Sequence, residues 1–498
     1  MTIPVIDVFA GPGGLNEGFS SIADDAGLQR FSTVASFEMD PWACETLRLR
    51  ATFRSLRAAA DGMPRAYVDL LMGRISLPEF FARDEVEIHA KEAFAEVQQL
   101  ELGEATRKQS DDVIRQRLAG ELQNWVLIGG PPCQAYSLAG RSRRAGDPSF
   151  KDDHKHILYR EYLNIIAKFE PAVFVMENVK GMLSSQHEGG PIFGRIKEDL
   201  EAPRVGLRYE LRSLVVPRAA ADLTPSDFVI RAEEHGIPQR RHRVILLGIR
   251  EDLAARQSAV LQKQSPVSLR SAIGDLPAVR SRLSPLSSDS PSAWHEARLV
   301  AAALAEAQSP HATSIPRFQG ARWLDYRPRL DGELGEWLVD RSLDGVSLHE
   351  ARRHMRGDLE RYAYLSYMAG QGSFPKVMDL PSHLAPNHRN ASRADAPFAD
   401  RFRVQPWDSP STTVVSHIAK DGHYYIHPDP LQMRSLTVRE AARLQTFPDN
   451  YLFVGNRTQQ YHQVGNAVPP LLARKIGEIV HALIDGEPAP LGKLSPAS

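Results

Sequence analysis

Residues 4–14 read PVIDVFAGPGG, and this stretch decides the fold. The apolar run Pro4–Phe9 has the composition of a buried β-strand, and the glycine-rich turn after it leads into a helical pattern. Glycines at Gly11, Gly13 and Gly14 permit a tight turn and let a ligand approach the backbone closely. A plain structural turn would have the same composition, so the loop alone is weak evidence for a ligand site.

A second apolar run, Thr33–Glu38, ends in an acid, with Asp40 just beyond it. An acid at the end of the second strand of such a sheet can hold the diol of a ribose. The glycine loop and this acid together indicate a nucleoside cofactor. The spacing Gly-x-Gly-Gly lacks the full G-x-G-x-x-G of dinucleotide sites, which disfavours an NAD-linked oxidoreductase.

Three more apolar runs follow within the first 250 residues, at Trp125–Gly130, Ala172–Met176 and Arg243–Ile249. They are short, rich in Val, Ile, Leu and Phe, and show little polar alternation, as strands buried on both faces of a parallel sheet do. Helical patterns such as Pro41–Arg54 and Lys155–Phe169 lie between the runs. The alternation predicts an α/β fold with a Rossmann-like, doubly wound, mostly parallel sheet.

The pattern changes along the chain in a way that predicts two domains. Residues 1–250 form the first, interrupted at 71–123 by a helix-forming stretch with 11 acidic and 7 basic residues, which we interpret as a solvated helical insertion. Residues 251–405 are rich in Pro, Ser, Arg and Gly and predict a second, loop-rich domain that carries recognition. Residues 406–498 return to the first domain.

Composition excludes several protein classes. The 498 residues carry 60 basic and 61 acidic side chains, so the chain is not a globally basic nucleic-acid coat, although a local basic cleft remains open. Two cysteines, Cys44 and Cys133, are too few for a disulfide framework. No apolar run approaches the roughly 18 residues of a membrane span, and the N-terminus lacks the features of a signal peptide. We expect a cytosolic protein without a membrane partner.

The motif Gly129-Gly130-Pro131-Pro132-Cys133-Gln134 follows a predicted strand, at the edge where open α/β sheets place their ligands. A cysteine on a rigid Pro-Pro turn is a candidate nucleophile. A free cysteine is more often inert and buried, so the motif by itself leaves both interpretations open. Cys44 lies inside an apolar helical pattern, where the inert interpretation prevails.

Two further motifs point to the same edge of the sheet. Glu177 and Asn178 follow the strand Ala172–Met176. A partly buried Glu at this position can act as an acid. The alternative, which the same sequence allows, is that Asn178 caps a helix and Glu177 is exposed. The alternation of Gln239, Arg241 and Arg243 places them on one face of a strand, where arginines can bind a phosphate or a carbonyl. An ordinary solvated charge run is the alternative.

With these blocks in view, the sequence resembles the cytosine-specific DNA methyltransferases that methylate carbon 5 with S-adenosylmethionine. The resemblance rests on six blocks in order, FAGPGG, GGPPCQAYS, MENVKG, PQRRHRV, LTVREAARLQTFPD and QVGNAVPP, which span the chain from Phe9 to Pro470. It implies a class I methyltransferase fold with a target-recognition domain.

The resemblance also implies a cofactor site for S-adenosylmethionine, with S-adenosylhomocysteine as product and no metal. Glu38 would take the ribose, Met39 or Trp42 would flank the adenine, and Asp69 would match the family's acid near the adenine amino group. The full set of implied cofactor residues is Phe9, Gly11, Gly13, Gly14, Glu38, Met39, Asp69, Pro131, Leu158, Asn466 and Val468. The Arg-Gly that commonly precedes the family's leucine is absent before Leu158.

The chemistry implied by the resemblance starts with the Cys133 thiolate adding to carbon 6 of cytosine, which makes carbon 5 nucleophilic. Protonated Glu177 would donate to N3, and Asn178 would order the cysteine turn. Because carbon 6 is inaccessible in stacked DNA, the base must be flipped out. The implied catalytic residues are Cys133, Glu177, Asn178, Gln239, Arg241 and Arg243; the implied DNA contacts are Gln134, Ser137, Arg141, Arg143 and Arg144.

The expected substrate is a specific double-stranded DNA sequence, and the expected form is a monomer on DNA. A restriction–modification pair with a separate cognate endonuclease and a solitary enzyme both stay open. Alternatives are an RNA (tRNA) cytosine-5 methyltransferase and a non-catalytic DNA-binding relative. The large loop-rich region 251–405 favours DNA over RNA, and the intact Cys133, Glu177 and Arg241 disfavour a non-catalytic role. Arg317, Arg322, Arg327 and Arg329 are the arginines that composition suggests for recognition.

Overall fold

The computed structural model divides the chain into two compact units. The residues that it describes are 2–60, 62–120, 123–132, 155–184, 186–187, 190–285, 287, 289–308, 316, 318–387 and 400–486. The first compact unit, here called the sheet unit, comprises Met1–Ala59, Asp84–Ser265 and Ala467–Ser498. The second compact unit comprises Ala60–Arg83 and Pro266–Asn466. The expected boundaries near residues 250 and 405 are therefore displaced.

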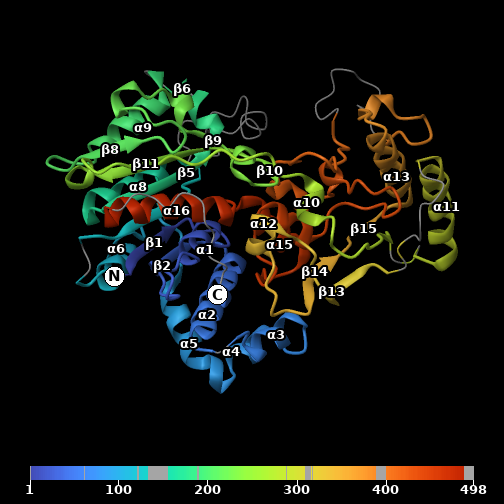
Figure 1. The fold of residues 1–498 in the computed structure, drawn as a ribbon, viewed down its shortest axis with the longest axis horizontal. Helices are drawn as coiled ribbons and strands as arrows, with labels where there is room; N and C mark the ends of the chain where they lie inside the picture. The colour runs from blue at the N-terminus through green and yellow to red at the C-terminus, as the bar shows by residue number, and fades with distance from the viewer. Residues whose placement is uncertain are drawn as a thin grey trace. The chain divides into compact units, whose positions relative to one another are not determined.

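The sheet unit is built on a sheet in which the structure describes eight strands, in the order β3-β2-β1-β4-β5-β11-β8 with β9 also paired to β11 (Figure 1). The first five of these strands run parallel, and β11 is antiparallel to its neighbours. All five predicted strands are present, and the mostly parallel α/β fold is confirmed. The strands are β1 (Ile3–Val8), β2 (Phe31–Glu38), β3 (Val97–Gln99), β4 (Val126–Gly129), β5 (Val173–Val179), β8 (Tyr209–Arg212), β9 (Val229–Arg231) and β11 (His242–Arg250).

Helices cover both faces of this sheet. One apolar cluster joins Ile6, Val8, Phe174 and Val244 of the strands to buried side chains of α6, α8 and α9, and Asn16 of α1 bonds to Ser36 on the other face. None of the helices in the described ranges combines the length and the apolar composition that a bilayer crossing requires. The helices of the unit are α1 (Gly14–Ser20), α2 (Pro41–Ala59), α5 (Asp84–Glu96), α6 (Arg107–Arg117), α8 (Lys155–Phe169), α9 (Ile192–Glu201) and α16 (Pro470–Asp485).

Residues 71–123 are not a separate insertion. Their first part, to Arg83, belongs to the second unit, and the rest supplies α5, α6 and the edge strand β3 of the main sheet. Ion pairs hold α6 on α8, since Arg107 binds the buried carboxylate of Glu161 at 2.7 Å and Lys168 binds that of Asp111 at 2.5 Å. The acidic composition of this stretch therefore reflects paired carboxylates as well as a solvated face.

The last helix of the chain completes the sheet unit by packing directly against the first (Figure 1). A methyl group at Gly18 of α1 would lie 2.4 Å from the backbone nitrogen of Arg474 in α16, and one at Gly14 would lie 2.1 Å from the carbonyl oxygen of Val468. Only glycine permits these approaches. The two ends of the sequence thus share one interface, which explains why the ordered pattern returns late in the chain.

The second unit contains more regular structure than its loop-rich sequence predicts. A hairpin of β13 and β14 and two long helices, α11 and α13, lie within the stretch expected to be mainly loops. The helices are α3 (Arg65–Leu71), α4 (Leu77–Phe81), α10 (Leu269–Ile273), α11 (Pro291–Gln308), α12 (Gly332–Leu338), α13 (Arg356–Gly370), α14 (Val438–Leu444) and α15 (Arg457–Asn466). The strands are β12 (Arg282–Leu283), β13 (Gly320–Asp325), β14 (Gly345–Glu350), β15 (Arg353–His354) and β16 (Ser411–Thr412).

A buried ionic network surrounds α14 in this unit. Arg434 binds both oxygens of Glu440 at 2.6 Å, and Arg443 binds both oxygens of Asp449 at 2.8 and 2.6 Å. Arg443 also donates to Asp275 at 2.7 Å, and the side chains of Arg443 and Arg434 are almost fully buried. The charged stretch LTVREAARLQTFPD is therefore an internal anchor of the second unit and not a solvated helix face.

His349 makes this network sensitive to acid. It lies between Thr437 Oγ1 at 3.0 Å and the carbonyl oxygen of Pro277 at 2.7 Å, partners that suit the neutral ring with its proton on Nε2. Burial lowers the pKa of His349 to about 4. An unfolded histidine titrates near 6.5, so unfolding takes up a proton as the pH falls from about 6.5 to about 4. The stability that His349 contributes is present above this window and lost through it.

We therefore expect the second unit to lose about 2 kcal/mol of unfolding free energy between pH 7 and pH 5 from His349 alone. Urea unfolding at both pH values measures this loss. His349→Gln should unfold with a smaller pH dependence than the wild type. An equal pH dependence in His349→Gln and the wild type would contradict the assignment.

Candidate active site

The glycine loop after β1 has a backbone that few residues tolerate. Gly11 and Gly13 have φ angles of 55° and 86°, and Phe9 adopts a φ of 56°, which is uncommon for a residue with a bulky side chain. A methyl group built on Gly11 would meet no atom within 4 Å. The loop thus turns sharply and leaves open space beside its backbone. Strained backbone of this kind is typical of ligand-binding positions.

Glu38 ties this loop to the end of β2. One carboxylate oxygen accepts the Gly11 N–H at 2.8 Å, and the other accepts the N–H groups of Met39 at 2.9 Å and Asp40 at 2.8 Å. Burial raises the pKa of Glu38, although these backbone hydrogen bonds act in the opposite direction. A carboxylate offers about four lone-pair positions, so one remains for a hydroxyl of a bound ribose.

Apolar surface lies beside this carboxylate. The side chains of Met39 and Trp42 are 58% and 40% exposed, which is high for side chains of their size. They follow β2 directly and provide a surface on which a flat heteroaromatic ring can pack. Leu158 on α8 is half-buried, and Val468 is buried against the backbone of Gly14. The sheet unit therefore combines a turn, a carboxylate and apolar side chains that together fit a nucleoside.

The expected acid near the adenine is not supported at Asp69. Asp69 lies within α3 in the second unit, where it pairs with Arg74 at 3.2 Å and Arg83 at 3.4 Å. The third parallel strand is β3, and its end is linked to β2 by a bond from the Leu100 N–H to the Glu38 carbonyl. The first acid after that strand is exposed Glu101. Sequence patterns missed it because β3 has only three residues, VQQ, and no apolar run.

Asp7 is a second acid that the sequence analysis passed over. It stands in the middle of β1, fully buried, and neither carboxyl oxygen has a hydrogen-bond partner among the described residues. Burial, with the nearby charge of Glu38, raises the pKa of Asp7 well above its usual range. An acid inside the apolar run IPVIDV was the available signal. Burial therefore favours the neutral form of the Asp7 carboxyl group.

The ends of β4 and β5 bring the second group of predicted residues together. Asn178 is buried, and its Nδ2 donates to the carbonyl oxygen of Pro131 at 3.2 Å while its Oδ1 accepts the Val179 N–H at 2.8 Å. The side chain therefore holds the turn that leads toward Cys133. It is not the helix cap that was the alternative interpretation.

Glu177 is fixed by an arginine from the neighbouring strand. In the antiparallel pairing of β5 with β11, Val179 faces Arg243, and Arg243 Nε lies 2.8 Å from Glu177 Oε1. Both side chains are about 15% exposed, at 16% and 14%. Glu177 Oε2 points toward Gly130, where a methyl group would lie 3.0 Å away. The carboxyl group is thus held beside the glycine-proline turn with one oxygen outside the ion pair.

The predicted arginine face on one strand is wrong in its geometry. Gln239 and Arg240 form the short strand β10, His242 begins β11, and the chain bends at Arg241, whose N–H bonds back to the Gln239 carbonyl at 3.0 Å. Gln239 and Arg241 are buried, while Arg243 bonds to Glu177. Because the chain bends at Arg241, the three residues do not alternate along one strand. The burial of Gln239 and Arg241 also disagrees with the alternative of a solvated charge run.

Several predicted residues cannot be compared with the structure. Cys133, Gln134, Ser137, Arg141, Arg143 and Arg144 lie outside the described residues, as does Arg317. Asn466 belongs to the second unit, where its Nδ2 lies 3.2 Å from His462 Nδ1. Of the arginines suggested for recognition, Arg322 donates to the Leu70 carbonyl at 2.9 Å and Arg327 pairs with Asp344 at 3.4 Å.

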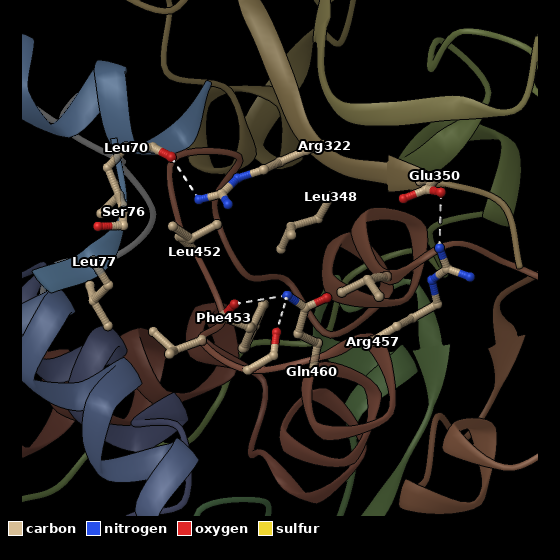
Figure 2. Close-up of a pocket in the computed structure, with 13 residues that line it drawn as sticks. Leu70, Ser76, Leu77, Arg322, Leu348, Glu350, Leu452, Phe453, Arg457 and Gln460 are labelled. Carbon is tan, nitrogen blue, oxygen red and sulfur yellow. Dashed lines mark hydrogen bonds and ion pairs between the residues drawn. The ribbon is translucent and has the colours of Figure 1, made fainter. Parts of the chain in front are cut away.

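The second unit holds a cavity of about 410 Å³ (Figure 2). Apolar side chains such as Leu77, Leu348 and Phe453 line it, and Arg322 and the Arg457–Glu350 ion pair stand at its edges. None of the residues predicted for catalysis or cofactor binding belongs to its lining. The candidate active site therefore lies in the sheet unit, where the glycine loop follows β1, Glu38 ends β2, and Glu177 and Asn178 lie near the end of β5.

Gly130 is a position where a small change should slow catalysis without affecting folding. The added methyl of Gly130→Ala would crowd Glu177 Oε2 and displace the carboxyl group by a few tenths of an ångström. Because reaction rates depend steeply on the placement of reacting groups, we expect the single-turnover rate to fall by about 10-fold or more. Gly194→Ala, which meets no atom within 4 Å, is the matched control. Equal single-turnover rates for both variants would contradict this role.

Comparison with known proteins identifies the family of the chain. The sequence profile of the family described as C-5 cytosine-specific DNA methylase matches residues 80–481. Type II methyltransferase M.Bpa9945I of Bacillus paralicheniformis is 35% identical over 97% of this chain and 99% of its own length. Type II methyltransferase M.AgeI of Thalassovita gelatinovora is 31% identical over 72% of this chain and 83% of its own.

A solved structure supports the fold. A protein encoded within an E. coli prophage, described as a DNA modification methyltransferase, superposes with a TM-score of 0.56 at 20% identity, covering 97% of this chain and 100% of that one. Since the profile covers most of the chain and a relative aligns at 35% identity over nearly all of it, the chain belongs to the C-5 cytosine-specific DNA methylases.

Proposed function

We propose that the protein transfers a methyl group from S-adenosylmethionine to carbon 5 of cytosine within a specific double-stranded DNA sequence. The observation that carries the proposal is the Glu177 carboxyl group, held by Arg243 beside the Gly130–Pro131 turn that leads to Cys133. Asn178 fixes the same turn through the Pro131 carbonyl. The acid thus lies on β5, beside the turn after β4 from which the chain continues to the candidate nucleophile Cys133.

The cofactor fits the glycine loop of the sheet unit. Open space beside Gly11, the anchored carboxylate of Glu38 and the exposed side chains of Met39 and Trp42 suit the methionine, ribose and adenine parts in turn. We assign the contact with the adenine amino group to Glu101 in place of Asp69, because Glu101 follows the third parallel strand. When bound, the cofactor supplies an electrophilic methyl group on a sulfonium.

The protein's own groups prepare the cytosine. The Cys133 thiolate forms a bond to carbon 6, and a proton shared between Glu177 Oε2 and N3 balances the charge that develops on the ring. Carbon 5 then accepts the methyl group. A base removes the proton from carbon 5, and the bond between carbon 6 and sulfur breaks, so that the thiolate leaves. Flipping of the cytosine out of the duplex gives the thiol access to carbon 6.

The experiment is to incubate the purified protein with methyl-labelled S-adenosylmethionine and, separately, duplex DNA and tRNA. We expect label only in DNA, and tRNA labelling alone would overturn the proposed substrate. Cys133→Ala should abolish labelling while cofactor affinity is retained; Cys44→Ala is the control, because Cys44 is buried in α2 and burial raises its pKa to about 12. Retained turnover in Cys133→Ala would refute the nucleophile.

A second measurement tests the covalent step directly. Duplex DNA with 5-fluorocytosine at the target position should form a stable complex with the wild type, because fluorine cannot leave as the proton does. Absence of that complex on a confirmed target would argue against the mechanism. Bisulfite sequencing of DNA from cells that express the chain identifies the target. Loss of cleavage of that DNA by an endonuclease with the same target sequence would show that the modification protects the site.

A further inference from the structure

A short loop of the second unit, residues 371–378, presents two large apolar side chains to solvent. Phe374 is 56% exposed and Met378 is 46% exposed, and Lys376 between them is exposed as well. Single exposed apolar side chains are common on protein surfaces and carry little meaning. Here the exposed side chains Phe374, Lys376 and Met378 alternate with the less exposed Pro375 and Val377 along one loop. We call Phe374, Lys376 and Met378 the ridge.

The backbone of this loop is fixed at its first end by the way α13 terminates. The Ser373 N–H donates to the Met368 carbonyl at 2.9 Å and the Gly372 N–H donates to the Ala369 carbonyl at 3.0 Å. Gly372 adopts a φ of 77°. These two bonds and the left-handed glycine form a Schellman motif, which sets the direction in which the chain leaves the helix. Phe374 therefore follows a defined turn.

The other end of the loop is anchored as well. The Lys376 N–H donates to Asp379 Oδ2 at 2.9 Å, and the Asp379 N–H returns to the Lys376 carbonyl at 3.0 Å. Val377 packs against the buried cluster that contains Leu365 and Leu380. Alternate residues thus face the core and the solvent, so the exposure of the ridge follows from a fixed backbone.

The chemistry of the ridge fits duplex DNA. Aromatic and aliphatic side chains contact thymine methyl groups or enter between base steps, a lysine binds phosphate, and an amide such as that of exposed Gln371 can read an adenine edge. A stable protein partner would need about 800 Å² of contact on each side, far more than three side chains supply. A rigid mixed ridge suits a groove better than a flat protein surface.

We propose that residues 371–378 form a DNA-reading loop in which Phe374 contacts base edges of the target and Lys376 binds a phosphate. This inference rests on the proposed function. It replaces Arg322 as the leading recognition candidate, because Arg322 is engaged with the Leu70 carbonyl inside its own unit.

The test compares binding of the wild type, Phe374→Ala, Lys376→Ala and the control Leu299→Ala, a 54% exposed apolar side chain on α11. Fluorescence anisotropy measures Kd for the methylated target sequence and for an unrelated duplex. Phe374→Ala should raise Kd for the target about 10- to 100-fold and leave the unrelated duplex within about 2-fold. Lys376→Ala should weaken both duplexes and reduce the slope of log K against log salt by about one. Leu299→Ala should bind as the wild type does.

Other results would overturn the proposal in distinguishable ways. If the wild type methylates duplex DNA and Phe374→Ala binds its target normally, the loop is not a reader although the enzyme's function stands. If the wild type methylates no DNA, the proposed function and the loop assignment both fail. If Phe374→Ala changes the sedimentation coefficient of the free protein but not DNA binding, the ridge is a contact between copies. Thermal unfolding midpoints and cofactor affinity should match across all variants.

Discussion

Replacement of Glu177 by Gln is expected to lower the single-turnover rate of methyl transfer by roughly 10²- to 10⁴-fold, the range that a positioned acid contributes. The substitution keeps the size of the side chain and a hydrogen bond with Arg243, but an amide cannot share an acidic proton with N3 of cytosine. The charge that develops on the ring would then lack its partner in a site where both side chains are mostly buried. Rapid-quench measurement with saturating DNA and labelled cofactor gives the rate.

Cofactor affinity separates this effect from misfolding. Glu177 lies on β5, whereas the loop and carboxylate proposed for the cofactor follow β1 and β2. We therefore expect the Kd of S-adenosylmethionine for Glu177→Gln to stay within about 2-fold of the wild type, since no interaction that would hold the cofactor is removed. Glu198→Gln, at an exposed position on α9, is the control for loss of a carboxylate. An unchanged transfer rate in Glu177→Gln would remove this residue from the acid role.

Replacement of Arg443 by Met should destabilise the second unit by about 3–5 kcal/mol, because it removes the arginine that binds the buried carboxylates of Asp449 and Asp275 and leaves Asp449 only the longer contact with Arg439 at 3.8 Å. Such a loss is a large part of the stability of an ordinary domain. Urea unfolding, followed by proteolysis that maps the cleaved segments, measures it. Arg341→Met, on the exposed surface of the same unit, should change the free energy by no more than about 0.5 kcal/mol.

A double replacement distinguishes the ion pair from simple packing. Arg443→Met combined with Asp449→Leu removes the main unpaired charge, and it should recover part of the lost stability. If the double variant is less stable than the wild type by the sum of the losses measured for the two single variants, the two residues contribute independently. Additive costs would show that their ion pair is not what stabilises α14.

The sheet was predictable because its central strands are continuous apolar runs. The run Trp125–Gly130 lies between two other strands and had to be apolar on both faces, so its composition alone identified it. β3 lies at the edge, needs only three residues and contains two glutamines, so no periodicity marked it. Without that strand, the sequence offered no reason to consider Glu101 as well as Asp69 for the acid near the adenine.

Site residues could be predicted where a short stretch of sequence places them at the end of a strand. Contacts between segments that are distant in the sequence could not be predicted. Glu177 and Asn178 could be assigned to a strand end from sequence, but the Arg243 partner depends on antiparallel pairing between distant strands. In the second unit, Arg443 reads as a surface residue of an amphipathic helix. Its burial follows from Asp275, which is remote in sequence and contacts it only after folding. Pairings of this kind leave no pattern in either segment.

The contact between α1 and α16 has a consequence for biosynthesis. Gly14 and Gly18 pack against Val468 and a helix that begins at Pro470, so this contact cannot form until the ribosome has translated those residues. A nascent chain that ends before Val468 therefore cannot complete the contact beside the glycine loop. We expect premature termination upstream of that residue to yield an inactive product, because α16 is part of the sheet unit.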